Sequence, residues 1–206
     1  GFALADYYLN KGQSVVITYR SQRPEVQEVT GKGALCVQAD FATDAGIYEA
    51  AELLSEQCPR LQSIVHNASS WFTDPGGTED LDNLALMMRI HVGASMVLTD
   101  RLANALLQSD NPSVINISDH VATRGSDQHM AYAASKSAML NLTKSQAKKY
   151  APDIRVNALC PALLEFREED DSAYRERAQN KSALKIVPGF DVAIEAICYL
   201  QTNRYT

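Results

Sequence analysis

Short apolar runs alternate with longer amphipathic stretches along most of this chain, and this alternation constrains the fold more than any other feature. The expected strands are short, mostly apolar and rich in Val and Ile; they lie at Ser14–Tyr19, Ala34–Gln38, Ser63–His66, Ser113–Ile117 and Arg155–Leu159. Expected helices lie between them, at Phe2–Asn10, Asp44–Gln57, Leu81–Leu107 and Ala131–Tyr150. The repeated strand–helix order predicts a doubly wound parallel sheet with helices on both faces, in three α/β/α layers. A chain of 206 residues has the size of one such domain, over residues 1–206.

Composition excludes several classes of protein. The net charge of -6 argues against nonspecific binding of nucleic acid, because a phosphate backbone requires a basic face. No apolar run approaches the roughly 20 residues of a membrane helix, and no signal peptide is visible at the start. The four cysteines show no metal or redox spacing and are interpreted as reduced, buried thiols: Cys36, Cys58, Cys160 and Cys198. We therefore expect a cytoplasmic protein with a small-molecule partner and no metal, membrane or nucleic acid.

Residues 165–187 differ from the rest of the chain because charged side chains dominate their first half. The run Glu168-Glu169-Asp170-Asp171 is followed by Tyr174-Arg175-Glu176-Arg177. A charge run by itself is usually only a solvated surface. We predict a solvated helix or a mobile flap over the substrate at this place.

The start of the chain lacks an element that a sheet of this type normally has. Such a sheet begins with a strand and a glycine-rich turn that leads into the first helix, whereas here Gly1 is followed directly by helical sequence. If that first strand is the central one, its loss leaves a gap in the hydrogen-bonded ladder. We interpret the sequence as a truncated record of a longer polypeptide.

The pair Tyr132 and Lys136 carries the strongest chemical pattern. Residues four apart lie on one face of a helix, so the phenol and the ammonium point into the same space. A free phenol has a pKa of about 10, and we expect the neighbouring cation to lower it toward useful acid–base chemistry. A bare pair of this kind occurs often by chance on surface helices. Here it begins a helix after a strand that ends at Ile117-Ser118-Asp119, where ligands bind in doubly wound sheets.

These segments resemble the short-chain dehydrogenase/reductases. The resemblance is carried by Tyr132-Ala133-Ala134-Ser135-Lys136, by Ile115-Asn116-Ile117-Ser118-Asp119 before it and by Val156–Pro161 after it, and it covers essentially the whole chain. It implies a Rossmann-type fold, with Gly1 as the last glycine of the phosphate-binding turn. The family commonly forms tetramers through paired long helices, so the resemblance also implies a homo-oligomer, a tetramer or a dimer, which the apolar stretch Leu81–Leu107 would permit.

Departures from the family pattern indicate the substrate. Asp119 stands thirteen residues before Tyr132, where the family usually has serine; Ser118 is out of register. An aspartate there is characteristic of the family's pteridine reductases. The segment His66–Trp71 resembles their N-N-A-S-S-F, in which the aromatic ring stacks on the pterin and the serine contacts ligand and cofactor; Trp71 and Ser69 match these positions. A core or interface tryptophan is the alternative for Trp71.

Within the family the chain resembles the bacterial dihydromonapterin reductases. Arg124-Gly125-Ser126-Asp127, Gln179-Asn180-Lys181-Ser182 and Ile90-His91-Val92 are similar to segments of that group. Most of the family has at His91 an asparagine that holds a proton-relay water. A histidine there either conducts protons or is a packed, hydrogen-bonded helix residue; we favour the structural role.

The cofactor preference is indicated by Arg20 and Ser21, which end the second strand of the family. Relatives that prefer NAD have an acidic residue there, whereas an arginine pairs with a 2′-phosphate, so NADPH is expected. The other cofactor contacts implied by the resemblance are Gly1, Asp40, Phe41, Asn67, Ala68, Ser69, Ile117, Tyr132, Lys136 and Pro161. Ala162 and Phe166 replace the usual glycine and threonine, so contacts near Pro161 are expected to differ.

The expected activity is reduction of a dihydropterin, such as dihydromonapterin or dihydrofolate, by hydride transfer to C6 of the C6=N5 imine. Tyr132 is the expected proton donor, with water as the alternative; Lys136 supports it, and Asp119 orients Tyr132 or the polar edge of the pterin. The substrate contacts are Ser69, Trp71, Asp119 and Tyr132. Two rival functions remain: a conventional NADPH carbonyl reductase of the same family, and a dinucleotide-sensing protein without catalysis.

Overall fold

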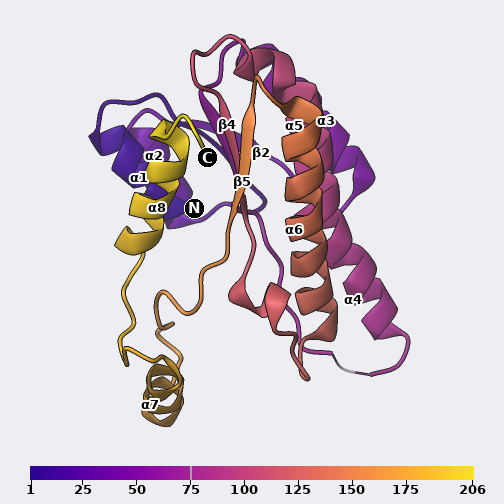
Figure 1. The fold of residues 1–206 in the computed structure, drawn as a ribbon, viewed down its shortest axis with the longest axis vertical. Coiled ribbons are helices and arrows are strands. Elements are labelled where there is room, and N and C mark those ends of the chain that lie inside the picture. Colours follow the sequence, from indigo (N-terminus) through magenta and orange to yellow (C-terminus); the bar gives the residue numbers. More distant parts are fainter. Residues whose placement is uncertain (75) are drawn as a thin grey trace.

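Five short parallel strands form the middle layer of the molecule (Figure 1). The computed structural model describes residues 1–74 and 76–206. The strands are β1 (Val16–Tyr19), β2 (Leu35–Gln38), β3 (Ser63–His66), β4 (Ser113–Ile117) and β5 (Arg155–Leu159). They pair in the orders β1-β2 and β3-β4-β5, so the ladder of the described residues is interrupted between β1 and β3. The predicted parallel, doubly wound architecture is confirmed, together with the predicted gap.

Helices cover both faces of the strands (Figure 1). One face carries α1 (Phe2–Asn10), α2 (Pro24–Gly31) and α8 (Asp191–Thr202). The other carries α3 (Asp44–Gln57), α4 (Glu79–Met88), α5 (Ala94–Leu106) and α6 (Met130–Tyr150). Helices α2 and α8 were not predicted from the sequence. In α2 only Val26 and Val29 are buried, which is too few apolar positions to show a helical period.

The predicted helix Leu81–Leu107 is not a regular α-helix throughout. A π-helical turn, Arg89–Gly93, separates α4 from α5. Such turns are rare and often lie at functional sites. This one contains His91, whose side chain is fully buried.

Between the strands and the helices α3 and α5 lies the largest apolar cluster. It includes Val37, Phe41, Ile47, Ala51 and Leu98. A Cβ atom on Gly46 would lie only 2.2 Å from the carbonyl oxygen of Asp40. The absence of a side chain at Gly46 therefore lets the start of α3 pack directly against the end of β2, which fixes Asp40 at the edge of the sheet.

Residues 165–187, hereafter the flap, extend away from the three layers and contain α7 (Ser172–Lys181) (Figure 1). No residue of α7 is buried, which confirms the predicted solvated helix. Arg175 donates to the carbonyl oxygens of Asp170 and Arg167 at 2.8 and 2.6 Å, and the rings of Phe166 and Tyr174 meet edge to face. The flap thus has its own internal contacts. Its mobility stays a prediction.

The thiols are less buried than expected. All four cysteines are free, but only Cys58 is buried, and Cys160 at the end of β5 is exposed. The expectation of buried thiols is therefore wrong for Cys160, because the chain leaves the sheet at that residue and enters the loop before Pro161. Within residues 1–74 and 76–206 we find no helix whose length and hydropathy would let it span a bilayer.

Candidate active site

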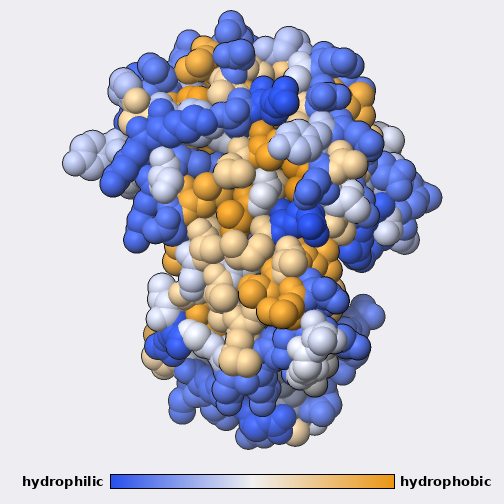
Figure 2. Space-filling view, turned by 90° about the vertical axis from the view of Figure 1, so that its right-hand side faces the viewer, coloured by the Kyte–Doolittle hydropathy of each residue, from blue (hydrophilic) through white to orange (hydrophobic). Residues whose placement is uncertain are grey.

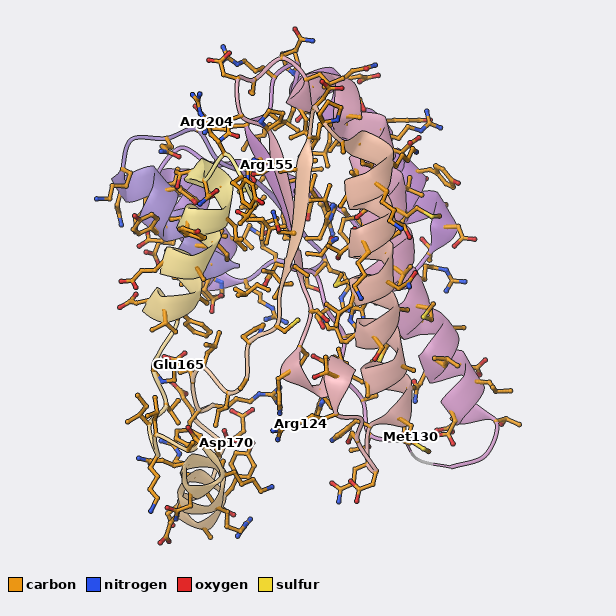
Figure 3. The ribbon with its side chains drawn as sticks, in the orientation of Figure 1. Arg124, Met130, Arg155, Glu165, Asp170 and Arg204 are labelled. Atoms are coloured by element: carbon orange, nitrogen blue, oxygen red, sulfur yellow. The ribbon has the colours of Figure 1, made fainter. Side chains whose placement is uncertain are left out.

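The carboxyl ends of β3, β4 and β5 lie at one end of the sheet, and the predicted catalytic residues follow them. Asn67–Trp71 come after β3, Asp119 after β4 and Pro161 after β5. Figure 3 shows Met130 at the start of α6 and Asp170 of the flap at this same end of the molecule. The start of α6 is held there by Asp74, which accepts hydrogen bonds from the amides of Met130 and Ala131.

Tyr132 and Asp119 are in direct contact, as one of the two roles expected for Asp119 requires. The Tyr132 hydroxyl donates to Oδ2 of Asp119 at 2.9 Å, and Oδ1 of Asp119 accepts from the amide of Val121 at 2.8 Å. Burial and the Asp119 carboxylate both raise the pKa of Tyr132 above its ordinary value of 10. Tyr132 is therefore protonated at neutral pH, in the state that donates a proton.

The expectation that Lys136 makes this phenol more acidic is wrong. The Lys136 ammonium lies 5.7 Å from the centre of the Tyr132 ring and donates instead to the carbonyl oxygen of Ile117 at 2.9 Å. The carboxylate, in direct contact with the hydroxyl, acts in the opposite sense and is closer. The sequence spacing placed the cation and the phenol on one face, but it did not reveal that the nearer charge is negative.

Lys136 is only 2% exposed. Burial lowers the pKa of its ammonium to about 8, and Asp119 opposes this effect. Ser118, the residue out of register with the family serine, donates to the carbonyl oxygen of Lys136 at 2.9 Å. Ser118 therefore holds α6 against the end of β4 and does not face the phenol.

His91 links two parts of the site. Its Nε2 lies 2.9 Å from the Ser69 hydroxyl and accepts from the amide of Ser70 at 3.2 Å. Its Nδ1 lies 2.8 Å from the hydroxyl of Ser135, which donates to the carbonyl oxygen of Tyr132 at 2.7 Å. Burial and the charge of Lys136 lower the pKa of His91 to about 3. Ser135 was not predicted as a site residue, since its contact with His91 joins residues 44 positions apart.

Trp71 lies beside the start of α6. Its ring centre is 4.3 Å from that of His129, at 37°, and the Arg167 guanidinium lies 5.6 Å from the indole. His129 donates from Nδ1 to the carbonyl oxygen of Phe72 at 2.9 Å and precedes Tyr132 by three residues. Trp71 is 49% exposed, so it is not a core residue. His129 and Arg167 were not predicted; both are polar loop residues without a distinctive spacing.

Two predicted cofactor residues line one groove. Arg20 at the end of β1 and Asp40 after β2 border a groove of about 500 Å³ together with Gly46 at the start of α3. Arg20 and Ser21 are exposed, and among the described residues Arg20 has no ion-pair partner. Phe41 was also predicted to contact the cofactor, but its side chain packs in the core at 9% exposure. Only its backbone is therefore available to a ligand.

The arrangement fits a phosphorylated dinucleotide. Gly1 precedes α1, and a Cβ atom on it would lie 3.1 Å from the side-chain nitrogen of Asn67, so the two segments approach closely at the helix start. Amides at a helix N-terminus bind phosphates. A diphosphate would be held at this end of α1, and a 2′-phosphate at the guanidinium of Arg20. The Tyr132–Lys136 pair would hold a nicotinamide ribose. Asn67, Ala68 and Ser69, directly after β3, are exposed.

Comparisons with known proteins find relatives over the whole length of the chain. The family model described as enoyl-(acyl carrier protein) reductase matches residues 1–201. Dihydromonapterin reductase of Enterobacter sp. (strain 638) is 44% identical over 207 residues, which cover 100% of this chain and 86% of that protein. The corresponding protein of Escherichia coli (strain K12) is 40% identical over the same shares.

Solved structures are similar over the same length. FolM alternative dihydrofolate reductase 1 from Brucella canis, complexed with NADP, matches with a TM-score of 0.87 and 25% identity over 99% of this chain and 83% of that chain. A putative short-chain dehydrogenase/reductase from Burkholderia xenovorans matches with a TM-score of 0.84 and 26% identity, over 100% and 88% of the two chains.

Proposed function

This chain belongs to the short-chain dehydrogenase/reductase family, and from that membership we propose that it reduces a dihydropterin to the tetrahydropterin with NADPH. The observation that carries the proposal is the Tyr132–Asp119 hydrogen bond of 2.9 Å, which keeps a protonated phenol at the carboxyl end of β4. The name of the 44%-identical relative and the NADP-bound structure support the substrate class and the cofactor.

Each residue of the site has its own role in the proposed reaction. NADPH, when bound, supplies the hydride that reaches C6 of the pterin. Tyr132 donates its hydroxyl proton to the adjacent ring nitrogen, N5, and Asp119 holds the hydroxyl in place. Lys136, fixed by the carbonyl oxygen of Ile117, offers its ammonium to the ribose hydroxyls. The exposed face of Trp71 provides a flat surface for the pterin, since aromatic stacking contributes about 0.5–1.5 kcal/mol beyond buried area.

The proposal is tested by following NADPH oxidation with dihydromonapterin, dihydrofolate and simple ketones in parallel. We expect turnover with the dihydropterins and little with the ketones. The reverse ranking would identify a conventional carbonyl reductase. Binding of NADPH without turnover of any substrate would identify a dinucleotide-sensing protein.

Arg20 is expected to determine the preference for NADPH over NADH. A hydrogen bond to a charged group contributes about 1.5–3 kcal/mol, so Arg20→Ala should raise the KM for NADPH about 10- to 100-fold and leave that for NADH within about twofold. Steady-state kinetics with both cofactors measure this. Arg60→Ala, in the loop before β3 at the opposite end of the strands, is the matched control and should change neither constant. Equal losses with NADPH and NADH in the Arg20 variant would contradict the assignment.

Trp71→Ala is expected to raise the KM for the dihydropterin about 10-fold, from lost stacking and lost apolar contact, with a smaller change in kcat. Trp71→Phe, which keeps an aromatic face, should lie close to wild type. The KM for NADPH should stay unchanged in both variants. A fall in kcat at unchanged pterin KM would show that the indole does not form the substrate surface.

We further infer that the enzyme is a cytoplasmic homo-oligomer. Figure 2 shows a band of apolar residues across the face that carries α5 and α6. Met96, which is 53% exposed, and Leu142 line a shallow groove of about 470 Å³ on this face. A second copy of the chain would cover it, which supports a dimer or a tetramer; four free thiols suit a reducing compartment. Sedimentation of wild type and Met96→Lys tests the assembly, and an unchanged monomer in both would reject it.

A further inference from the structure

We propose that His91 is a positioning residue: a neutral imidazole that fastens the loop Ser69–Trp71, the substrate loop, to the backbone of Tyr132 through Ser135. The inference rests on the proposed function only for its kinetic consequences. Its geometric content, that one buried ring joins the substrate loop to the catalytic helix, stands on the contacts of His91 alone.

The hydrogen bonds of His91 define which nitrogen carries the proton. The amide of Ser70 can only donate, so Nε2 accepts from it and carries no proton. The Ser69 hydroxyl must then donate to Nε2 as well. Since a neutral imidazole has one proton, that proton is on Nδ1 and is donated to Ser135, whose own hydroxyl donates to the carbonyl oxygen of Tyr132.

On the side of Ser135 this network has no outlet for a proton, and on the other side Ser69, which also acts on the Tyr132 hydroxyl, donates to an Nε2 that carries no proton to return. It begins at the substrate loop and ends at the backbone carbonyl of Tyr132, which has no proton to pass on. A second proton on His91 would place Nε2–H against the amide of Ser70, and the ring is fully buried. The strong lowering of the pKa of His91 to about 3 agrees with a ring that stays neutral. His91 therefore joins two segments and does not relay protons between them.

The consequence is a fixed distance between the surface that binds the substrate and the group that protonates it. Trp71 follows Ser70 directly, and Tyr132 is three residues before Ser135 on α6. The π-helical turn Arg89–Gly93 brings the imidazole between them. Loss of the hydrogen bonds that Ser69 and Ser70 make to His91 should therefore impair binding of the pterin more than the chemical step.

Two substitutions separate the two ends of the link. In His91→Asn the short amide reaches the position of Nδ1, so it keeps Ser135 and loses Ser69 and Ser70. In His91→Gln the longer amide reaches the position of Nε2, so it keeps the substrate loop and loses Ser135. His66→Asn is the matched control, because His66 is also buried and, among the described residues, its ring makes one hydrogen bond, between Nε2 and the Thr99 hydroxyl at 2.9 Å.

Trp71 is the only tryptophan of the chain, so its fluorescence reports on the substrate loop without any turnover. We expect acrylamide to quench Trp71 more strongly in His91→Asn than in wild type, with His91→Gln and His66→Asn close to wild type. Loss of two net hydrogen bonds predicts about a 10-fold higher dihydropterin KM in His91→Asn, a smaller fall in kcat and an unchanged KM for NADPH. His91→Gln should keep the pterin KM within about threefold.

Several outcomes would overturn the proposal. If both His91 variants lower kcat at unchanged pterin KM, His91 relays protons. If His91→Asn and His66→Asn show the same rise in acrylamide quenching and in dihydropterin KM for the same loss of melting temperature, the His91 ring has only a general packing role. In the wild type, ¹⁵N NMR of His91 should show an Nδ1–H tautomer that does not titrate between about pH 5 and 9; a titration in that range rejects the network even if no variant folds. If wild type fails to turn over dihydropterins, the proposed function fails, while the quenching experiment still decides the role of His91.

Discussion

Tyr132→Phe is expected to lower kcat for dihydropterin reduction by about 10²- to 10⁴-fold, the contribution typical of a positioned general acid. The change removes the only acidic proton of the side chain and leaves the ring, and Lys136 still offers its ammonium to the ribose, so the KM for NADPH should change far less than kcat. Because burial and Asp119 raise the pKa of Tyr132 above 10, the wild type should not lose activity through deprotonation of this group between pH 6 and 9. Stopped-flow and steady-state assays over this range measure both effects.

The chain offers a closely matched control for this variant. Tyr150, at the far end of α6, also donates its hydroxyl to an aspartate, Asp100, at 3.2 Å. Tyr150→Phe makes the same chemical change on the same helix, away from the site, and should retain wild-type kcat. If Tyr132→Phe keeps more than about a tenth of the activity, water rather than the phenol donates the proton to N5.

Lys136→Met is expected to lower turnover by about 10²-fold or more while making the free protein more stable at pH 7. The pKa of the ammonium falls from 10.5 to about 8 on folding, and each tenfold change in acidity corresponds to about 1.4 kcal/mol, so burial of the charge costs about 3 kcal/mol. The hydrogen bond to Ile117, worth about 1 kcal/mol, is lost in the variant. A net gain of about 2 kcal/mol in the free energy of unfolding follows.

The pH dependence of that gain has a definite sign. A lysine whose pKa is lowered in the folded state destabilises it fully below about pH 8, and the penalty is relieved as the pH rises toward 10.5, where the unfolded chain also loses the proton. Urea denaturation at pH 7 and at pH 9.5 should therefore show a smaller difference between variant and wild type at the higher pH. Lys148→Met, an exposed position on the same helix, should change neither activity nor stability. A variant of Lys136 that is less stable at pH 7 would contradict the argument.

The strands and the places in the fold of the predicted site residues were predictable because both rest on local patterns. Short apolar runs gave all five strands within two residues at each end, and the spacing of Tyr132 and Lys136 placed them on α6. The π-helical turn at Arg89–Gly93 was not predicted, because the apolar residues before and after it were interpreted as one continuous helix, Leu81–Leu107. Helix α2 escaped prediction for the opposite reason, that few of its residues are buried.

Long-range contacts account for the rest of what the sequence did not reveal. His91 and Ser135 are 44 residues apart, and Trp71 and Arg167 are separated by the whole of α4, α5 and α6. The predicted direction of the pKa shift of Tyr132 was wrong for the same reason. Spacing along a helix identifies which side chains share a face, but only the folded molecule shows that Asp119 contacts the hydroxyl while Lys136 turns to Ile117.

The contact between Tyr132 and Asp119 also bears on the direction in which the enzyme works. With Tyr132 as the proposed proton donor, oxidation of a tetrahydropterin by NADP would begin with a phenolate that accepts the proton from N5, and such a phenolate would stand 2.9 Å from a carboxylate. The species competent for the backward reaction is thus scarce at neutral pH, whereas the species competent for the forward reaction is the resting enzyme. The overall reduction consumes a proton. The scarcity of the phenolate at neutral pH is therefore consistent with thermodynamic reversibility. A pH well above 9 would favour oxidation of the tetrahydropterin.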